Sequence, residues 1–517
     1  MGRERKDGRV STPAPPVPAA ARGLRGLPAR AAARAAARVA GLPPWLATLI
    51  GVLAWMAALA IIEPIVHGYL TNLPDQRLVD LNVYRTGGLA VLQGQPLYSV
   101  VTQPPQLLPF TYPPVAAVFA VPLALMSWPV AQAVWVAFVY VPLAVIVWYS
   151  FRPLLRRTGP LRPAAFAAIF CVCAYLFPMQ DEMRFGQVDA VLAAMVVADC
   201  AAVRPRWPRG ALVGLATAIK LIPGVFLVYL WVSGRHRAAR TAVIAAVAWT
   251  VGAFLLLPRD SVTYWTSVIF DSGRLGDNAG TENQSLRGLL LRFFLPGAAP
   301  GVLWVLIAVA VAVPGFVLAA RLARDRLETA GIAVTALLEL LISPVAWIHY
   351  FLMVIIAIGA IVGDGRRLRR VLVAAGTTVF FGLTVPWWGD SLVSHATVPR
   401  PVGRVVQGAF GLAALALVIV IARMRTTGAD RETGGGGYGG AAPAGAVTSG
   451  GPPELTRAER TGKPEAERTG QAGAERTGQA GAERTGQAGA ERTGQAGAEH
   501  ADGAGAPTPR ADAGLGK

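Results

Sequence analysis

The sequence predicts an all-α polytopic membrane protein with about ten to twelve transmembrane helices. Of its 517 residues, 54% are hydrophobic and 15% are charged, whereas a soluble domain carries about 25% charged residues. The apolar residues are concentrated between positions 44 and 422, where runs long enough to cross a bilayer follow one another. These runs are too long and too unpatterned for the strands of a membrane β-barrel, so we expect helices.

Both ends of the chain are expected to be disordered. Residues 1–43 are rich in Arg, Ala and Pro, and residues 423–517 are rich in Gly and Ala and contain the repeat AERTGQAG. A repeat without an apolar stripe cannot bury a core, so we expect a flexible tail rather than a solenoid. The transmembrane domain is therefore predicted to span residues 44–422.

The net charge of +18 comes from short basic clusters between the apolar runs, such as GRHRAAR and DGRRLRR. Such clusters follow the positive-inside rule and attract anionic lipid, so the expected partner is the bilayer. We expect no nucleic acid, because aromatic residues are not interleaved with these clusters as they are on a base-stacking surface. The clusters predict that both termini are cytoplasmic and that loops 258–300 and 388–400 lie outside.

Part of the span count stays open. Spans are predicted near residues 45–69, 241–257, 302–320, 330–345, 350–363, 371–387 and 403–422. The stretch 113–232 holds shorter apolar runs broken by prolines and charges. If every run crosses, the total is about twelve and some basic loops lie outside; with re-entrant hairpins it is about ten and those loops stay inside. Because broken helices at membrane depth line cavities, this stretch is a candidate for the active core.

The first outer loop runs from about Tyr69 to Tyr112 and contains a helix-compatible segment, residues 77–93. In a helix, Asp80 and Tyr84 would share one face with Gly87. Asp80 would then point into whatever cavity the spans enclose, and Tyr84 would be placed to contact a sugar or an acceptor.

Leucines of the same segment would seat the helix in the membrane interface as a horizontal amphipathic helix with Asp80 toward the cavity, and these are Leu78, Leu81 and Leu92. The plainer interpretation is that Asp80 is a solvated carboxylate that pairs with Arg77 or Arg85.

Two segments of the broken region carry ionisable residues. The stretch DEMRFGQVD is either a polar turn or a site in which Arg184 meets phosphate while Gln187 and Asp189 contact a sugar or acceptor. Lys220 lies within the apolar run ATAIKLIPG, with Pro223 behind it. A lysine in hydrocarbon is costly unless it snorkels or finds an anion, so Lys220 either reaches the boundary or binds a phosphate.

The last two segments lie in predicted outer loops. In TENQSLRGLLLRF, Asn283 and Gln284 offer neutral hydrogen bonds suited to sugar hydroxyls, while Arg287 or Arg292 could meet phosphate. His349, in SPVAWIHYF, is either a proton-transfer or phosphate-binding group or an interface anchor. No motif for a metal, a nucleotide sugar or ATP is present, so we expect neither metal nor cofactor.

Taken in order, several segments resemble glycosyltransferase family 87, the actinobacterial polyprenol-phosphate-mannose-dependent alpha-(1,2)-mannosyltransferases. The segments are DLNVYRTGGLAVLQGQPLY, FTYPP, FGQVDAVL, GLATAIKLIPGVFLVYLW, ENQSLRGLLLRF and SPVAWIHYF. The similarity covers roughly residues 45–422 and leaves out both tails.

The resemblance implies a GT-C bundle whose active site faces the extracytoplasmic side of the plasma membrane. It also implies a polyprenyl-phosphate-mannose donor and a glycolipid or lipoglycan acceptor of the cell envelope. The family's acidic residue after the first span falls on Asp80, and its histidine falls on His349. The sequence departs from relatives at WIHY, where an acid and two histidines are common, and at Asp189, where asparagine is common.

These residues predict an inverting mannosyltransferase. One carboxylate, Asp80, can take the acceptor's proton in a single displacement, and Lys220, His349 and an arginine can stabilise the departing phosphate. Two alternatives remain at this stage: a transferase of the same architecture for another lipid-linked sugar such as arabinose or glucose, or a lipid or sugar transporter.

Overall fold

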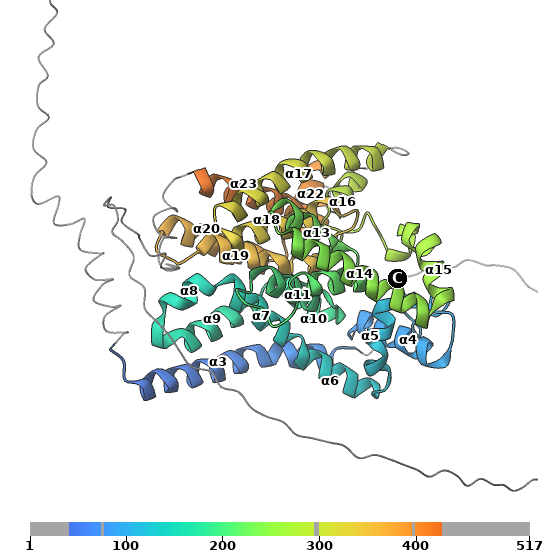
Figure 1. Ribbon diagram of the computed structural model, residues 1–517, viewed down its shortest axis with the longest axis horizontal. Helices are drawn as coiled ribbons and strands as arrows, with labels where there is room; N and C mark the ends of the chain where they lie inside the picture. Colours follow the sequence, from blue (N-terminus) through green and yellow to red (C-terminus); the bar gives the residue numbers. More distant parts are fainter. Residues whose placement is uncertain (1–40, 74–76, 294–298, 395–398, 427–517) are drawn as a thin grey trace, which may run out of the picture. The chain divides into compact units, whose positions relative to one another are not determined.

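The protein is helical throughout the part of the chain that the computed structural model describes (Figure 1). That part consists of residues 41–73, 77–293, 299–394 and 399–426. No strand forms within these ranges, so the prediction of an all-α protein is confirmed. The tails that we expect to be disordered, residues 1–43 and 423–517, lie almost entirely outside the described residues.

The helices follow one another with few long gaps. In the first half they are α3 (Pro44–Thr71), α4 (Val79–Gln93), α5 (Pro114–Ala124), α6 (Trp128–Phe138), α7 (Tyr140–Ser150), α8 (Arg152–Arg157), η2 (Gly159–Leu161), α9 (Arg162–Ala174), α10 (Phe177–Phe185), α11 (Asp189–Ala201), α12 (Ala211–Ile219), η3 (Ile222–Gly224) and α13 (Val225–Val232). In the second half they are α14 (His236–Leu256), α15 (Pro258–Thr266), η4 (Val268–Phe270), η5 (Ser272–Leu275), α16 (Leu286–Arg292), α17 (Ala299–Arg324), α18 (Glu328–Ile342), η6 (Ile348–Met353), α19 (Val354–Val362), α20 (Leu368–Gly382), α21 (Val385–Ser394), α22 (Arg400–Gln407) and α23 (Ala409–Thr426).

Within the described ranges, four helical stretches are long and apolar enough to cross a membrane unaided: α3, the continuous pair α6–α7, α14 and α17. Three further pairs reach that length only if a sharp bend is allowed, namely α9–α10 (69°), α20–α21 (50°) and α22–α23 (62°). The count is therefore up to seven among the described residues, and other apolar helices are shorter. The protein is a multi-pass membrane protein, and the predicted ten to twelve crossings stay a prediction.

Several predicted spans are not single straight helices. The run 371–387 bends between α20 and α21, where Pro386 follows the first residue of the new helix. The run 403–422 bends at Gly408, between α22 and α23. The run 350–363 begins as the 3₁₀ helix η6 and only then becomes α19. Hydropathy reports that a stretch is apolar, but proline and glycine decide where its helix breaks.

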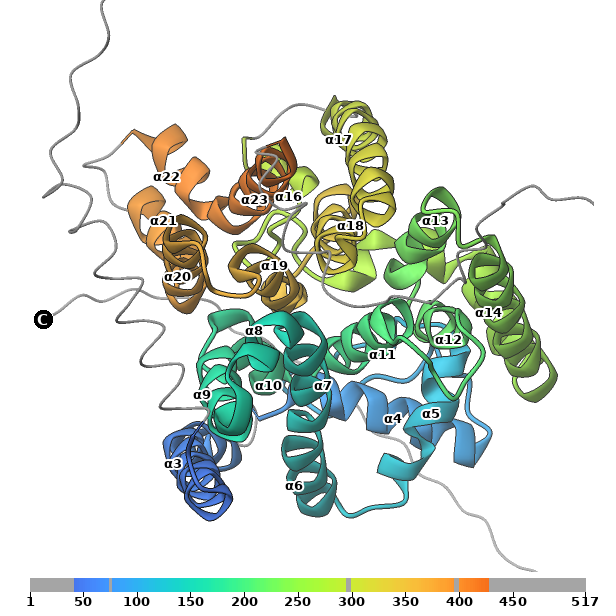
Figure 2. The same cartoon turned by 60° about the vertical axis from the view of Figure 1, so that its left-hand side comes forward.

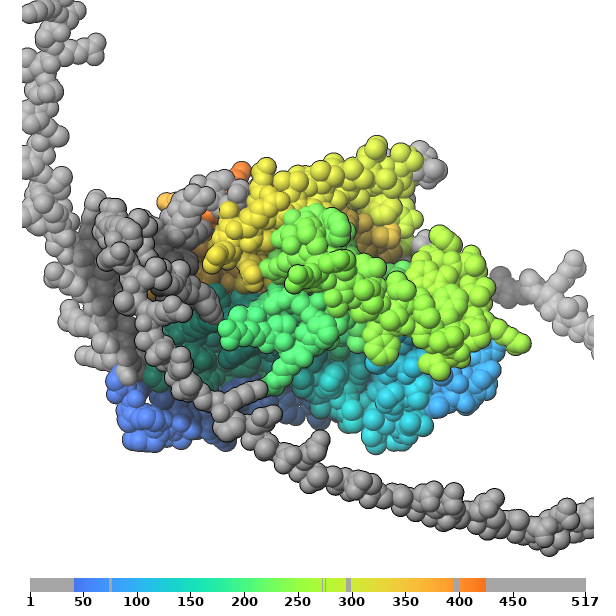
Figure 3. Space-filling view, viewed as in Figure 1, coloured from blue at the N-terminus to red at the C-terminus, as the bar shows by residue number. Residues whose placement is uncertain are grey.

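The helices divide into a central and a peripheral set (Figure 2). α18 and α19 lie centrally and are buried along almost their whole length. α14 and α17 lie at the edge, and only 17% of each apolar window is buried. Figure 3 shows α17 (yellow) beside α13–α15 (green) on one face, and on these edge helices Leu255 and Leu306 are exposed. Such an apolar outer surface is what a lipid-facing helix requires.

The helix predicted at residues 77–93 is confirmed as α4 (Val79–Gln93). It packs closely against α5, because a Cβ at Gly88 would lie 2.7 Å from the carbonyl oxygen of Ala120. The predicted contact of its leucines with lipid is wrong for Leu78 and Leu81, which are fully buried in the protein, whereas Leu92 is exposed. The tertiary partner of Leu81 is Gly186, the residue after α10.

The loops gather at two opposite ends of the bundle. α4, α5 and α15 lie at the right-hand end of Figure 1, and α8 lies at the left-hand end. The carbonyl of Asp364 accepts a hydrogen bond from Arg157, so the basic stretch after α7 meets the loop after α19. Arg235 likewise pairs with Glu328 at 2.8 Å, and this contact joins the loop before α14 to the start of α18.

Candidate active site

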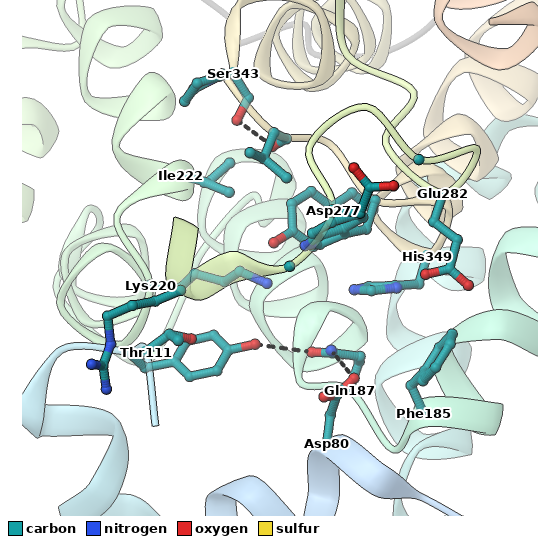
Figure 4. Close-up of a pocket in the computed structure, with 18 of the residues that line it drawn as sticks. Asp80, Thr111, Phe185, Gln187, Lys220, Ile222, Asp277, Glu282, Ser343 and His349 are labelled. Carbon is teal, nitrogen blue, oxygen red and sulfur yellow. Dashed lines mark hydrogen bonds between the residues drawn. The ribbon is translucent and has the colours of Figure 1, made fainter. Parts of the chain in front are cut away.

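A cavity of about 1220 Å³ opens among the ends of several helices (Figure 4). Its walls come from α4, the segment 108–113, the α10–α11 junction, the segment 220–225, the loop 268–282, residues 339–350, and the helices α21 and α22. Helix breaks and loops supply most of this lining. The prediction that the broken region 113–232 contributes to the core of the site is consistent with Gln187 and Lys220 in the wall.

Asp80 lies in the first turn of α4 and lines this cavity. Leu78, directly before the helix, adopts a left-handed conformation (φ 47°), and its N–H donates to the carbonyl of Arg184 at 3.2 Å. This bond ties the start of α4 to the end of α10. Neither Arg77 nor Arg85 pairs with Asp80, because their side chains donate to backbone carbonyls at Leu70, Asn72 and Met126. The plainer interpretation of Asp80 is therefore wrong.

Gln187 holds the Asp80 carboxylate in place. Its Nε2 donates to Asp80 Oδ2 at 2.6 Å. Gly186 lets the chain turn after α10, since it adopts φ 71° and a Cβ there would lie 2.7 Å from that of Leu81. Burial raises the pKa of Asp80 to about 7, although the bond from Gln187 and the charge of Lys220 oppose that rise. A carboxylate with a pKa near 7 is matched to proton transfer at neutral pH.

Two tyrosines orient the Gln187 amide. The Tyr84 hydroxyl lies 2.7 Å from Gln187 Oε1 and 2.9 Å from the Tyr112 hydroxyl, which is itself 3.3 Å from Oε1. Since the amide oxygen faces two hydroxyls, the amide nitrogen must face Asp80. Tyr84 thus acts on Asp80 through Gln187.

Lys220 already has an anionic partner within the protein. α12 ends at Ile219, and Lys220 Nζ lies 2.8 Å from both carboxylate oxygens of Asp189. The ammonium also lies 4.0 Å from the centre of the Tyr350 ring, within reach of a cation–π interaction. Neither snorkelling nor a bound phosphate is needed to account for this buried lysine.

His349 faces the cavity with both ring nitrogens unsatisfied. Nδ1 lies 3.5 Å from Asp181 and Nε2 lies 3.7 Å from Asp189, and neither nitrogen makes a hydrogen bond within the described chain. Buried polar groups normally find partners, so these nitrogens are available to a ligand. The rings of Phe185 and Tyr350 flank the imidazole at 6.1 and 4.9 Å.

Asn283 and Gln284 support the site from behind its wall. Asn283 Oδ1 accepts from the backbone of Ser285 and Ala346, at 3.2 and 3.1 Å. Gln284 donates to the carbonyls of Thr281 and Gln407 and accepts from the Phe410 N–H. Both side chains are buried and outside the cavity lining, so the structure does not bring them together with Asp80.

The arginines divide in a similar way. Arg184 is exposed and stacks over the Phe185 ring at 5.1 Å, and Arg287 is half-buried on α16, but neither lines the cavity. Arg292 is buried and donates to the carbonyls of Gly280 and Asn283, where it fastens the loop. Arg274 and Arg404 line the cavity instead.

Comparison with known proteins identifies the family. The model of glycosyltransferase family 87 matches residues 110–344. A polyprenol-phosphate-mannose-dependent alpha-(1-2)-phosphatidylinositol mannoside mannosyltransferase of Mycolicibacterium smegmatis is 34% identical over 384 residues, which cover 69% of this chain and 87% of the relative. A corresponding phosphatidylinositol pentamannoside mannosyltransferase of Mycobacterium tuberculosis is 33% identical over 423 residues, 80% of this chain and 94% of the relative. The chain belongs to glycosyltransferase family 87.

Membership of family 87 confirms the predicted resemblance and makes the protein a glycosyltransferase. A crystal structure of ArnT from Cupriavidus metallidurans bound to undecaprenyl phosphate is similar over 74% of this chain and 71% of that chain, with 16% identity and a TM-score of 0.35. A likeness this low carries no argument of its own. The family match includes Gln187 and Lys220 and leaves out Asp80 and His349.

Several residues of the family 87 cavity have no role in the predictions made above. Tyr112 appears there only as the end of the first outer loop, yet it helps to orient Gln187. Glu282 stands within the motif ENQS that supports the family resemblance, so its position was a usable signal. Arg274 and Arg404 carry no such signal, because nothing in the local sequence tells an arginine in a cavity wall from one in an outer loop.

Proposed function

We propose that this chain transfers mannose from polyprenyl-phosphate-mannose to a hydroxyl of a mannosylated glycolipid or lipoglycan, forming an alpha-(1,2) linkage. The domain responsible is residues 44–422, and the reaction takes place at the extracytoplasmic face of the plasma membrane with both termini cytoplasmic. The names of the relatives in two mycobacterial genera support the sugar, the lipid carrier and the acceptor class.

The observation that carries the proposal is the setting of Asp80. It is a carboxylate on α4, in the wall of a large cavity, with a pKa of about 7 and a hydrogen bond from Gln187 that fixes its orientation. In an inverting displacement it takes the proton of the acceptor hydroxyl while the oxygen attacks C1 of mannose. The bond between C1 and the phosphate oxygen breaks, and polyprenyl phosphate leaves with the electron pair.

The leaving phosphate requires donors that are free to meet it. Lys220 is held by Asp189, and Arg184 and Arg287 do not line the cavity. The two ring nitrogens of His349 make no hydrogen bond within the described chain, and Arg274 has a buried Nε without a hydrogen-bond partner while one Nη donates to the Tyr98 carbonyl. We therefore place the phosphate contacts on Arg274 and His349, which would stabilise the developing charge.

The test uses membrane vesicles from cells that express the full chain, supplied with radiolabelled polyprenyl-phosphate-mannose and an extract of acceptor glycolipids. Asp80→Asn preserves the size of the side chain and removes the base, so the rate of transfer should fall by about 10²–10⁴-fold. Detergent-solubilised Asp80→Asn protein should elute and melt like the wild type.

Label in new alkali-stable glycosidic bonds on mannolipids supports the proposal. Transfer at the wild-type rate by Asp80→Asn contradicts the assigned base. If wild-type vesicles move the labelled lipid across the membrane without forming bonds, the transferase proposal fails and the transporter alternative gains support. A preference for lipid-linked arabinose or glucose over mannose would contradict the assigned sugar.

A further inference from the structure

Glu282 is a cavity-lining carboxylate to which the reaction described above gives no part. It stands between residues that are fixed on both sides. Before it, the Thr281 hydroxyl contacts Asp390 at 3.0 Å and Gln407 at 2.6 Å, and after it, Asn283 is hydrogen-bonded on both amide atoms. The backbone at residue 282 is therefore held in place, and the side chain extends into the cavity beside His349 (Figure 4).

The Glu282 carboxylate has no hydrogen bond or ion pair with any described residue. It is half-buried, and this burial together with the charge of Asp181 raises its pKa, which the charge of Arg184 opposes in part. A carboxylate removed from water without a donor is unfavourable, so such a group is usually satisfied by a ligand.

The donors that the proposed substrates offer are hydroxyls. Polyprenyl-phosphate-mannose and a mannosylated glycolipid carry phosphate and sugar but no cation that the carboxylate could pair with. A carboxylate accepts through two oxygens and can take two neighbouring sugar hydroxyls at once. Glu282 and Asp80 both line this cavity, and the charge of Glu282 raises the Asp80 pKa.

We propose that Glu282 is a sugar-binding residue, which accepts hydrogen bonds from hydroxyls of a mannosyl ring held between Asp80 and His349. This inference rests on the proposed mannosyl transfer. The ring belongs either to the donor or to the terminal mannose of the acceptor, since both offer the same hydroxyls. Removal of a hydrogen bond to a charged group lowers kcat/KM by about 10–100-fold.

The experiment compares substrates that each lack one hydroxyl. Wild type, Glu282→Gln and Glu282→Ala are assayed with polyprenyl-phosphate-mannose and its monodeoxy analogues, and separately with monodeoxy acceptors. Glu328→Gln is the matched control, because Glu328 is half exposed on α18, pairs with Arg235 and does not line the cavity.

With the wild type, we expect kcat/KM to be about 10–100-fold lower for one or two deoxy analogues than for the parent substrate. This loss should occur either in the donor series or in the acceptor series, but not in both. Glu282→Ala should be equally slow with the parent substrate and with those analogues, and Glu282→Gln should fall between it and wild type. If Glu282→Ala abolishes the difference between parent and analogue in the donor series, the ring belongs to the donor; if it does so in the acceptor series, the ring belongs to the acceptor. Glu328→Gln should behave as wild type.

The inference would be overturned if, for every analogue, the loss in kcat/KM from the substitution at Glu282 simply multiplied the loss from the missing hydroxyl. Glu282 would then contact no particular hydroxyl. Complete inactivity of Glu282→Ala, together with labelled mannose attached covalently to Glu282 in the wild type, would also overturn it, since that identifies a nucleophile of a retaining reaction. Both outcomes require wild type to transfer mannose, so they are distinct from failure of the proposed function, in which wild type transfers none.

Discussion

Asp80 holds its proton near neutral pH because the protein buries its carboxylate and supplies only partial compensation. Burial is the largest influence on its pKa, and the hydrogen bond from Gln187 and the charge of Lys220 oppose it. Lys220 cannot compensate fully, because Asp189 occupies its ammonium group at 2.8 Å. The Asp80 pKa therefore depends on a neighbour in hydrogen-bond contact and on an ion pair further away.

The pH dependence of transfer should report this arrangement. Asp80 acts as a base only when deprotonated, and its pKa is about 7. Hence kcat/KM should rise about tenfold per pH unit below 7 and level off above it. Gln187→Leu removes the donor that favours the charged form, so the rise should shift to higher pH. Initial rates between pH 5 and 9 measure the shift.

Tyr112→Phe is the control for that experiment, since it removes a hydroxyl near Gln187 Oε1 but keeps the bond from Nε2 to Asp80. Its profile should stay close to the wild-type profile. A flat profile from pH 5 to 8, or a shift of Gln187→Leu to lower pH, would contradict the role assigned to Asp80.

Arg274 and Arg287 differ in their relation to the cavity, and this difference is testable. Arg274 lines the cavity and Arg287 does not. Arg274→Ala should raise the KM for the lipid-phosphate donor about tenfold or more, because a charge-assisted hydrogen bond is lost. Arg274→Lys should retain part of the affinity, and Arg287→Ala should change little. Titrations of the donor at saturating acceptor measure these KM values. A larger increase in KM for Arg287→Ala than for Arg274→Ala would show that Arg287, and not Arg274, binds the phosphate.

At the scale of single elements, α4 is placed by its contact with α5. Gly88 has no side chain at the point where the helix meets the Ala120 carbonyl, and this allows the backbones to approach. The face that carries Asp80 and Tyr84 is therefore fixed relative to the segment 108–113, which brings Tyr112 to Gln187. The close approach of two helices thus sets the geometry of the base.

Gly88→Ala should disturb this contact. Its Cβ would lie 2.7 Å from the Ala120 oxygen, and overpacking of this kind costs about 1–3 kcal/mol. We expect a lower melting temperature in detergent and reduced transfer. Gly252→Ala on α14 is the control, because no atom lies within 4 Å of its added Cβ. Equal melting temperatures for both variants would show that α4 is not fixed by this approach.

The sequence predicts elements better than it predicts their partners. The helix at residues 77–93 and the shared face of Asp80, Tyr84 and Gly87 follow from local periodicity, because the helix itself determines that face. The ion pair of Lys220 with Asp189 joins two different helices, and no local pattern contains it. For the same reason Asn283 and Gln284 were expected to meet sugar, whereas the fold directs both side chains to backbone groups.

At the scale of the whole membrane domain, the contacts bear on the orientation that the sequence left open. Arg157 meets Asp364, and Arg209 and Arg235 both donate to the carbonyl of Cys200. Arg209 precedes α12 and Arg235 follows α13, so the run 211–232 begins and ends beside the same carbonyl. We infer that this run is re-entrant, as in the arrangement with about ten crossings.

Cysteine labelling tests that arrangement. In a variant whose three native cysteines are replaced by alanine, single cysteines are introduced at the exposed positions Gln95, Arg206 and Arg366. A membrane-impermeant maleimide added to intact cells should label position 95, because the loop after α4 is expected to lie outside. Positions 206 and 366 should react only after the cells are opened, because a basic loop is retained in the cytoplasm.

Each outcome has a direct consequence for the proposed reaction. Labelling of position 206 in intact cells would support the count of about twelve crossings and contradict the re-entrant arrangement. Protection of position 95 in intact cells would place the loop after α4 in the cytoplasm, and Asp80 with it. The carboxylate could not then meet an acceptor at the outer face, so the side of the membrane on which transfer takes place depends on this one loop.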